Sequence, residues 1–205
     1  EKLATDHIKE PVSIGAMRFS VTGGFQMKLE DVKLGTTQDV KIGSVTLSLA
    51  VGSMFGEIKT VDKIEAESVT AAQEVLARLP KWMDAAIADK NVQINRIVLK
   101  GVKLETRGIQ VPNFDADLRL AEDGSIKAVT LATTDGKLTA ELSPRGSELD
   151  IAVSAGKGWV PPVGPPIEFT DFTATAVASR NQIRVDQFEA LLYDGAAKGR
   201  ALINW

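Results

Sequence analysis

The 205-residue chain contains no cysteine, which excludes disulfides, thiol nucleophiles and thiolate metal ligands and leaves the redox compartment undetermined. It contains one histidine, His7, so a multi-histidine metal site cannot form within the chain and a Ser-His-Asp triad would depend on this single residue. We interpret His7 as a surface residue. The sequence therefore predicts no catalytic residues, no metal, no cofactor and no enzymatic activity.

The chain also lacks a concentration of charge of one sign. Its net charge is -3, and its Lys and Arg residues are spread along the sequence, so no basic field is available for nucleic acid. No run reaches the roughly 18 to 20 apolar residues that a membrane-spanning helix needs, and "EKLATDHIKE" lacks the apolar core of a signal peptide. With 44% hydrophobic and 25% charged residues, the chain is typical of folded domains.

Alternation of apolar and polar residues is abundant, and it carries one recurring slip in which two polar residues replace one. The copies are "MKLEDVKL" from Met27, "VKIGSVTL" from Val40, "IQVPNFDA" from Ile109, "IEFTDFTA" from Ile167 and "IRVDQFEA" from Ile183, with "IVLKGVKL" from Ile97 as a near match. An extra residue within a two-residue period is typical of a β-bulge, which keeps apolar side chains on one face and bends the strand. The pattern predicts curled strands. The alternative, two short strands joined by a tight turn, remains open for each copy.

Further alternating segments at 12–19, 126–133, 138–142 and 149–155 are separated by turn signals such as "EDGS" and "PRGS". We therefore predict a mainly β fold, a highly curved antiparallel meander that forms an open half-barrel or groove. The segment "GWVPPVGPP" at 158–166 cannot lie inside a sheet, because proline donates no ladder hydrogen bond. We interpret it as a surface connection within one sheet spanning residues 1–205.

One segment, 70–89, has helical spacing, with Thr70 as the expected N-cap and Pro80 as a kink. Its apolar face comprises Leu76, Leu79, Met83, Ala86 and Ile87. A helix is about 10 Å across, whereas roughly ten strands about 4.8 Å apart span near 50 Å. One helix cannot cover such a sheet, so the apolar face either closes on itself or stays open as a trough.

The apolar positions of the pattern are the candidate lining of this groove. They are Phe25, Met27, Leu29, Ile42, Val45, Leu47, Ile97, Leu99, Phe169, Phe172, Ile183, Val185, Phe188 and Leu192. The intervening positions are mostly polar, and we interpret Asp115 and Asp117 as part of this solvated face and not as a glycosidase pair. The sequence leaves open whether the apolar positions line a groove for lipid chains or form the closed core of a structural envelope module.

Two stretches resemble the AsmA-like proteins of the Gram-negative envelope, which are related in architecture to bridge-like lipid-transfer proteins. "VKIGSVTLSLAVGSMFGEIKTVDKIEAESV" from Val40 is similar to their strand, short apolar turn and following strand, and the segment from Gly158 through "LYDGAAKG" to Trp205 is similar to a later strand pair. The resemblance implies a periplasmic segment of a larger protein, with an inner-membrane anchor that precedes it. It also implies phospholipid as ligand, a role in lipid transport and outer-membrane biogenesis, and envelope proteins as further partners. The 70–89 helix departs from the family pattern and either caps or plugs the groove.

Overall fold

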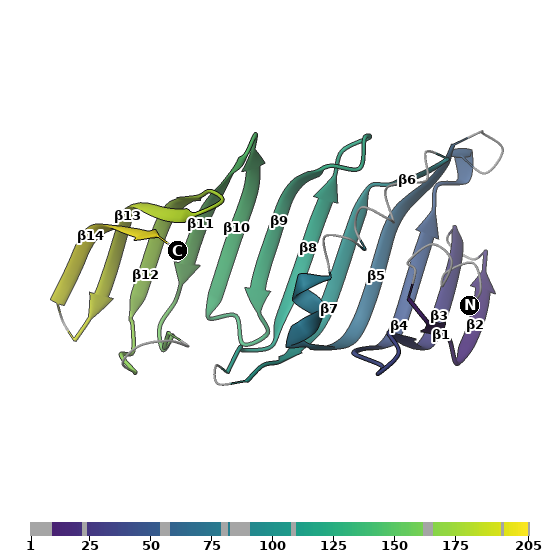
Figure 1. The fold of residues 1–205 in the computed structure, drawn as a ribbon, viewed down its shortest axis with the longest axis horizontal. Helices are drawn as coiled ribbons and strands as arrows, with labels where there is room; N and C mark the ends of the chain where they lie inside the picture. The colour runs from purple at the N-terminus through teal and green to yellow at the C-terminus, as the bar shows by residue number, and fades with distance from the viewer. Residues whose placement is uncertain are drawn as a thin grey trace. The chain divides into compact units, whose positions relative to one another are not determined.

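The computed structural model of the chain describes residues 10–21, 24–53, 58–78, 82, 91–107, 110–161, 166–193 and 195–204. The fold is mainly β, which confirms the predicted class. The described strands form an open sheet and do not close into a barrel (Figure 1). The chain divides into two compact units, Glu1–Ser125 (unit 1) and Ile126–Trp205 (unit 2).

Unit 1 contains the strands β1 (Val12–Ser13), β2 (Ala16–Ser20), β3 (Phe25–Leu34), β4 (Val40–Leu49), β5 (Lys59–Ala72), β6 (Val92–Ile94), β7 (Arg96–Glu105) and β8 (Phe114–Leu120), and the 3-10 turns η1 (Val51–Ser53) and η2 (Gln73–Ala77). Its strand order is β1-β3-β4-β5-β7-β8, with β2 also beside β3 and β6 also beside β5. β5 pairs in parallel with both β6 and β7, so the sheet is mixed and departs here from the predicted antiparallel meander. Parallel neighbours need a crossover of a dozen or more residues, and the segment after β5 supplies it.

The predicted helical segment lies in this crossover. β5 continues through Thr70 to Ala72, so Thr70 is a strand residue and not the predicted N-cap. Ala72 takes the N-cap position of η2 with no side-chain cap, and the N–H of Trp82 then donates to the carbonyl of Arg78 at 3.1 Å. The predicted kink at Pro80 and the predicted face residues Leu79, Met83, Ala86 and Ile87 lie outside the described residues, as does the side chain of Leu76.

Unit 2 is the antiparallel meander that the alternation predicts. Its strands are β9 (Ile126–Thr133), β10 (Leu138–Arg145), β11 (Glu148–Ala155), β12 (Asp171–Ala178), β13 (Gln182–Leu192) and β14 (Gly195–Asn204), and each pairs with the next in sequence. The described parts of the proline-rich segment, residues 158–161 and 166, lie between β11 and β12, outside the strands, as expected.

The slip in the repeated pattern marks irregular points inside continuous strands. In β13 the register shifts against both β12 and β14 around Asp186, and in β7 it shifts against β8 between Leu99 and Val102. These copies are therefore bulges, not pairs of short strands. The copies from Ile109 and Ile167 are different, because β8 and β12 begin only at Phe114 and Asp171. Pro112 precedes the start of β8, where a proline cannot donate a ladder hydrogen bond, and the backbone bends at Thr170 just before β12.

In unit 1 the irregular points of adjacent strands line up. The registers set Asp31 of β3 across from Gly43 of β4, Gly43 across from Ser68 of β5, and Ser68 beside Gly101 of β7. Asp31, Ser68 and Gly101 have positive φ angles of 52°, 56° and 60°. At Gly43 a side chain would bring its Cβ within 3.1 Å of the Ser68 Cβ, so any larger residue there would require Ser68 to shift by a few tenths of an ångström. The row keeps apolar side chains on one face along the whole length of each strand.

Candidate functional site: the apolar face of the sheet

Every predicted lining residue of unit 1 lies on one face of its sheet. Cross-strand partners share a face, and the ladders join Leu29 to Val45, Val45 to Ala66 and Ala66 to Leu99. A second row joins Met27, Leu47, Ile64 and Ile97, and Phe25 pairs with Leu49. On the other side of the row of irregular points that includes Gly43, Ile42 pairs with Val69 and contacts the same apolar cluster as Val45 and Leu99. We call this surface the unit 1 apolar face.

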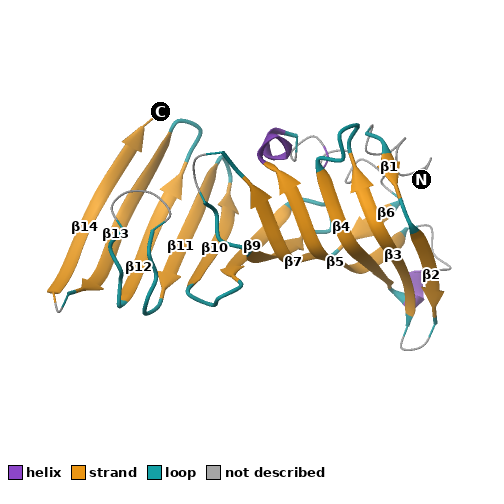
Figure 2. Cartoon of the chain, turned by 90° about the horizontal axis from the view of Figure 1, so that it is seen from below, coloured by secondary structure: helices purple, strands orange, loops and turns teal. Residues whose placement is uncertain are grey.

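Part of the unit 1 apolar face is a closed core. Val40, Ala66, Val69 and Val102 form a buried cluster with Val75 of η2, whose exposed fraction is only 2%. Figure 2 shows the helical segment lying to one side of the strands. The predicted lining residues around the cluster are half-buried, and no large side chain among the described residues is completely buried. The closed-core interpretation therefore fits the area beneath the crossover.

Ionic contacts hold the crossover in place. The guanidinium of Arg78 donates to the carboxylate of Asp39 at 2.5 Å, lies 3.5 Å from that of Glu10, and stacks over the ring of Trp82 at 5.5 Å. The hydroxyl of Thr37 also donates to Asp39. These hydrogen bonds, first that from Thr37 and then that from Arg78, lower the pKa of Asp39 below 3.8. Trp82 itself packs against the buried cluster.

In unit 2 the predicted lining residues of β12 and β13 also share a face. Phe172 pairs with Ala190, Phe188 with Ala174, and Val185 with Ala176 across the β13 bulge. Ile183 and Leu192 belong to the same face, which we call the unit 2 apolar face. The ring of Phe188 lies over Gly199 of β14, where an added Cβ would come within 2.7 Å of it. Because alanine or glycine lies opposite each of these large side chains, the surface of this face alternates between raised and recessed positions.

Within the described residues, no second sheet or helix packs on the unit 2 apolar face, although the rings of Trp159 and Phe169 lie against Phe172 at one end of it. Among these residues the strands of unit 2 make their main contacts only with their sheet neighbours. The large side chains of this face are only half-buried, because no facing element among the described residues covers them. They are Phe172, Ile183, Val185, Phe188 and Leu192. This arrangement differs from a sandwich, in which a facing sheet would bury them.

An aromatic cluster forms one end of the unit 2 apolar face. The ring of Phe169 lies 5.6 Å from that of Phe172, and the ring of Trp159 lies 5.5 Å and 5.2 Å from those two. An isolated β-bridge between Trp159 and Phe169 ties the two ends of the proline-rich connection together. Trp159 is not among the predicted lining residues, because the sequence "GWVPPVGPP" predicts only a connection. The tryptophan just before the prolines was the available signal.

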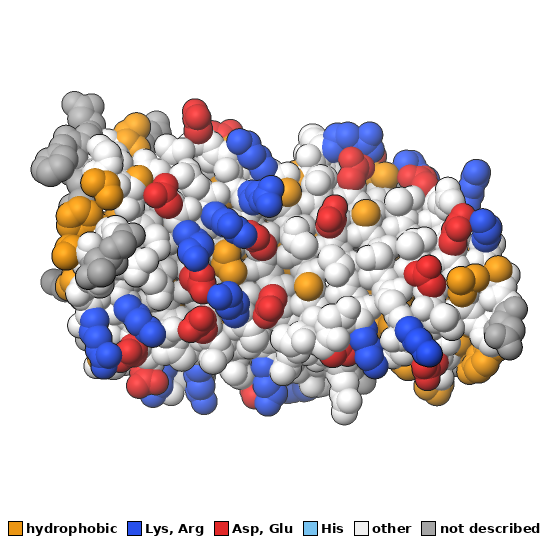
Figure 3. Space-filling view, turned by 180° about the vertical axis from the view of Figure 1, so that it is seen from behind, with side chains coloured by type: hydrophobic (Ala, Val, Ile, Leu, Met, Phe, Trp, Pro, Cys, Tyr) orange, Lys and Arg blue, Asp and Glu red, His pale blue; other side chains and the backbone are white. Residues whose placement is uncertain are grey.

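The opposite face of unit 1 is polar and carries interleaved charges of both signs (Figure 3). Asp117 binds Arg96 through both carboxylate oxygens, and this hydrogen bonding lowers its pKa. Asp115 accepts a hydrogen bond from the backbone N–H of Gly101 at 2.7 Å. Glu65 accepts from Lys100 at 2.6 Å and from Lys63 at 2.5 Å, and these bonds lower its pKa below 4.5, Lys100 contributing most. These carboxylates therefore form hydrogen bonds and ion pairs with neighbouring residues on the polar face of the sheet.

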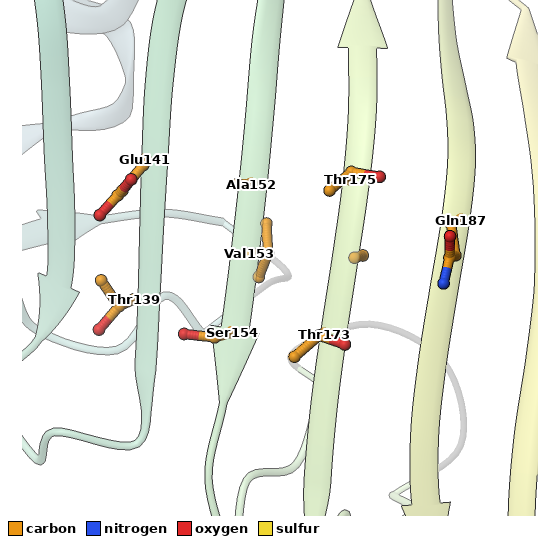
Figure 4. A pocket seen from close by; sticks show the side chains of 9 residues that line it. Thr139, Glu141, Ala152, Val153, Ser154, Thr173, Thr175 and Gln187 are labelled. Atoms are coloured by element: carbon orange, nitrogen blue, oxygen red, sulfur yellow. The ribbon is translucent and has the colours of Figure 1, made fainter.

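The polar face of unit 2 has a shallow hollow of about 360 Å³ over β10 to β13. Figure 4 shows threonine and serine side chains along it, with the longer Glu141 and Gln187 beside them. Its lining comprises Thr139, Glu141, Ala152, Val153, Ser154, Thr173, Ala174, Thr175 and Gln187. Thr139, Ser154 and Thr173 are partners across three adjacent strands. The hollow arises because these side chains are small, and it offers hydroxyl groups in place of the ion pairs found in unit 1.

Comparison with protein-family models, curated proteins and solved structures found no match. In the described part of the chain, no three metal-binding side chains are gathered into a group. No helix among the described residues has the length and hydropathy needed to cross a membrane. His7 lies outside the described residues.

Proposed function

We propose that the chain binds phospholipid acyl chains along the apolar face of its sheet and takes part in lipid transport between envelope membranes. The observation that carries this proposal is the unit 2 apolar face, which has no second layer over its half-buried Ile183, Val185 and Phe188 within the described residues. The periplasmic location, the inner-membrane anchor and the role in outer-membrane biogenesis rest on the resemblance to AsmA-like proteins.

An acyl chain suits this surface because the surface demands no polar partner. The backbone N–H and C=O groups of β12 and β13 are engaged in ladders with neighbouring strands, so they need nothing from a ligand above the sheet. Each methylene group removed from water contributes about 0.8 kcal/mol. Binding of this kind needs no catalytic group, and the proposed role is that of a binding or transfer module.

A second candidate function is a structural or protein-interaction module with a closed core. The buried cluster of Val40, Ala66, Val69, Val75 and Val102 favours it for the covered part of unit 1. On that hypothesis a protein partner, and not lipid, covers the unit 2 apolar face. The two candidates predict different contacts for the same side chains.

The test uses photo-crosslinking groups at neighbouring residues on opposite faces. Phe172 and Phe188 point to the apolar face, whereas Thr173 and Glu189, one residue further along each strand, pair with each other on the polar face. Acyl-chain binding predicts lipid adducts from the first pair and none from the second in protein purified without harsh detergent. Adducts to protein alone from Phe172 and Phe188 would contradict the lipid function and support the interaction module. Native mass spectrometry then identifies the lipid.

A further inference from the structure

The two ends of the unit 2 strands carry connections of different chemistry. At one end, the connections after β10 and β12 consist of Gly146, Ser147 and residues 179–181, none of which is apolar. At the other end, the lower end in Figure 1, Tyr193 is 77% exposed, Leu191 47% and Val160 41%. We call Trp159, Val160, Phe169, Leu191 and Tyr193 the aromatic end of unit 2.

Hydrogen bonds tie the members of the aromatic end together. The N–H of Phe169 donates to the carbonyl of Trp159 at 2.8 Å, and the N–H of Thr170 donates to the carbonyl of Leu191 at 2.8 Å. The connections after β11 and β13 therefore lie side by side. Because the Trp159 ring also lies 5.2 Å from the Phe172 ring, the aromatic end continues directly into the unit 2 apolar face.

We propose that the aromatic end rests in the interfacial region of a phospholipid bilayer, where acyl chains pass between the bilayer and the unit 2 apolar face. This inference rests on the proposed lipid-binding function and names the place where lipid enters. Tryptophan and tyrosine combine an apolar ring with a polar tip, so they favour the boundary between headgroups and acyl chains. A chain that enters beside Trp159 meets Phe172 next, because the two rings lie 5.2 Å apart.

The size of the patch argues for a lipid surface and against a protein partner. A stable protein interface uses about 20 to 30 residues on each side. The aromatic end instead offers a few exposed side chains around a half-buried tryptophan, which is suited to shallow and reversible insertion.

The charges around the aromatic end predict its lipid preference. The ammonium group of Lys137 donates to the carbonyl of Gly158 at 2.9 Å, and Lys157 is exposed beside it, but Glu168 and Asp171 are exposed there as well. The balance of charge is not basic, so the contact does not require anionic lipid. Vesicles of phosphatidylcholine are therefore the appropriate probe.

The experiment follows the fluorescence of Trp159 on phosphatidylcholine vesicles whose acyl chains carry bromine, a short-range quencher. The chain has three tryptophans, and Trp82→Phe together with Trp205→Phe leaves Trp159 as the only reporter. We expect quenching on brominated vesicles and none on unbrominated ones. Adding Val160→Asp and Tyr193→Asp should reduce the partition coefficient by about tenfold for each side chain replaced.

The matched control places the same charges at the opposite end as Ser147→Asp and Asn181→Asp, and it should change partitioning less than about threefold. Absence of quenching, or an equal loss in both double variants, would overturn the proposal. Concentration-dependent self-association that only the Val160 and Tyr193 changes abolish, without quenching, would also overturn it and identify a contact between copies. Crosslinking of detergent-dispersed lipid at Phe188 reports on acyl-chain binding independently: adducts without quenching reject the membrane contact alone, whereas loss of adducts rejects the proposed function.

Discussion

The open and covered parts of the apolar face should respond differently to the same buried charge. Val69, which is 7% exposed, packs with Val40, Ala66, Val75 and Val102 beneath the crossover. Val69→Asp places a carboxylate in this cluster without a partner, which costs several kcal/mol. Domains are stable by only about 5 to 15 kcal/mol, so we expect unit 1 to unfold or to lose most of its stability.

Leu192→Asp makes the corresponding change on the unit 2 apolar face. Leu192 is half-buried near the β13–β14 turn, with no second layer over its face within the described residues, so the new carboxylate can stay hydrated. The lost burial corresponds to about 1 kcal/mol, roughly half the value of a fully buried leucine. We expect a folded protein whose lipid capture at Phe188 is lost, because a charge now interrupts the path of the acyl chain.

Urea unfolding measures both variants in single-tryptophan backgrounds. Trp82 reports on unit 1 when Trp159 and Trp205 are replaced by Phe, and Trp159 reports on unit 2 when Trp82 and Trp205 are replaced by Phe. An unfolded Leu192→Asp protein would refute the reasoning, since it would mean that the unit 2 apolar face is a packed core. Retained lipid capture in a folded Leu192→Asp protein would refute the proposed path of the chain. Tolerance of Val69→Asp would refute the closed cluster.

Further predictions concern single contacts. Gly199→Val should destabilise unit 2 by about 1 to 3 kcal/mol in urea, because its side chain collides with the Phe188 ring, and Phe188→Ala should relieve part of the loss. Glu65, whose folded pKa lies below its ordinary 4.5, contributes stability above that pH and loses it as the pH falls through the folded pKa. The urea midpoint of unit 1 should therefore fall on acidification below pH 4.5, and less in Glu65→Gln; equal slopes would exclude Glu65 as a source. His7→Ala should leave any in vivo activity intact, whereas a folded but inactive variant would contradict the prediction that the chain has no enzymatic activity.

Local pattern predicted most of the strands and the face of their apolar residues, although it assigned Thr70 of β5 to a helix and began β8 and β12 too early. Side chains alternate across a strand with a period of two, so Met27, Leu47 and Ile97 could be assigned to one face without knowing their neighbours. The slip was readable for the same reason, because an extra residue is visible in the spacing wherever a strand continues through it, as at Asp31, Gly101 and Asp186. Ring contacts such as that between Trp159 and Phe172 join residues of different segments, and spacing alone does not reveal them.

Strand partners and coverage were decided by tertiary structure. β5 and β7 each have the spacing of a strand, but nothing in that spacing specifies their parallel pairing, which arises because the crossover returns the chain to the end of the sheet where β5 began. The same return lays Val75 and Trp82 on Val40 and Val69 and converts part of the apolar face into core. An apolar side chain has the same spacing whether protein, lipid or water lies over it. The sequence therefore determined which residues stand on the apolar face, whereas only the three-dimensional arrangement of the strands and the crossover decided which of them are covered by protein.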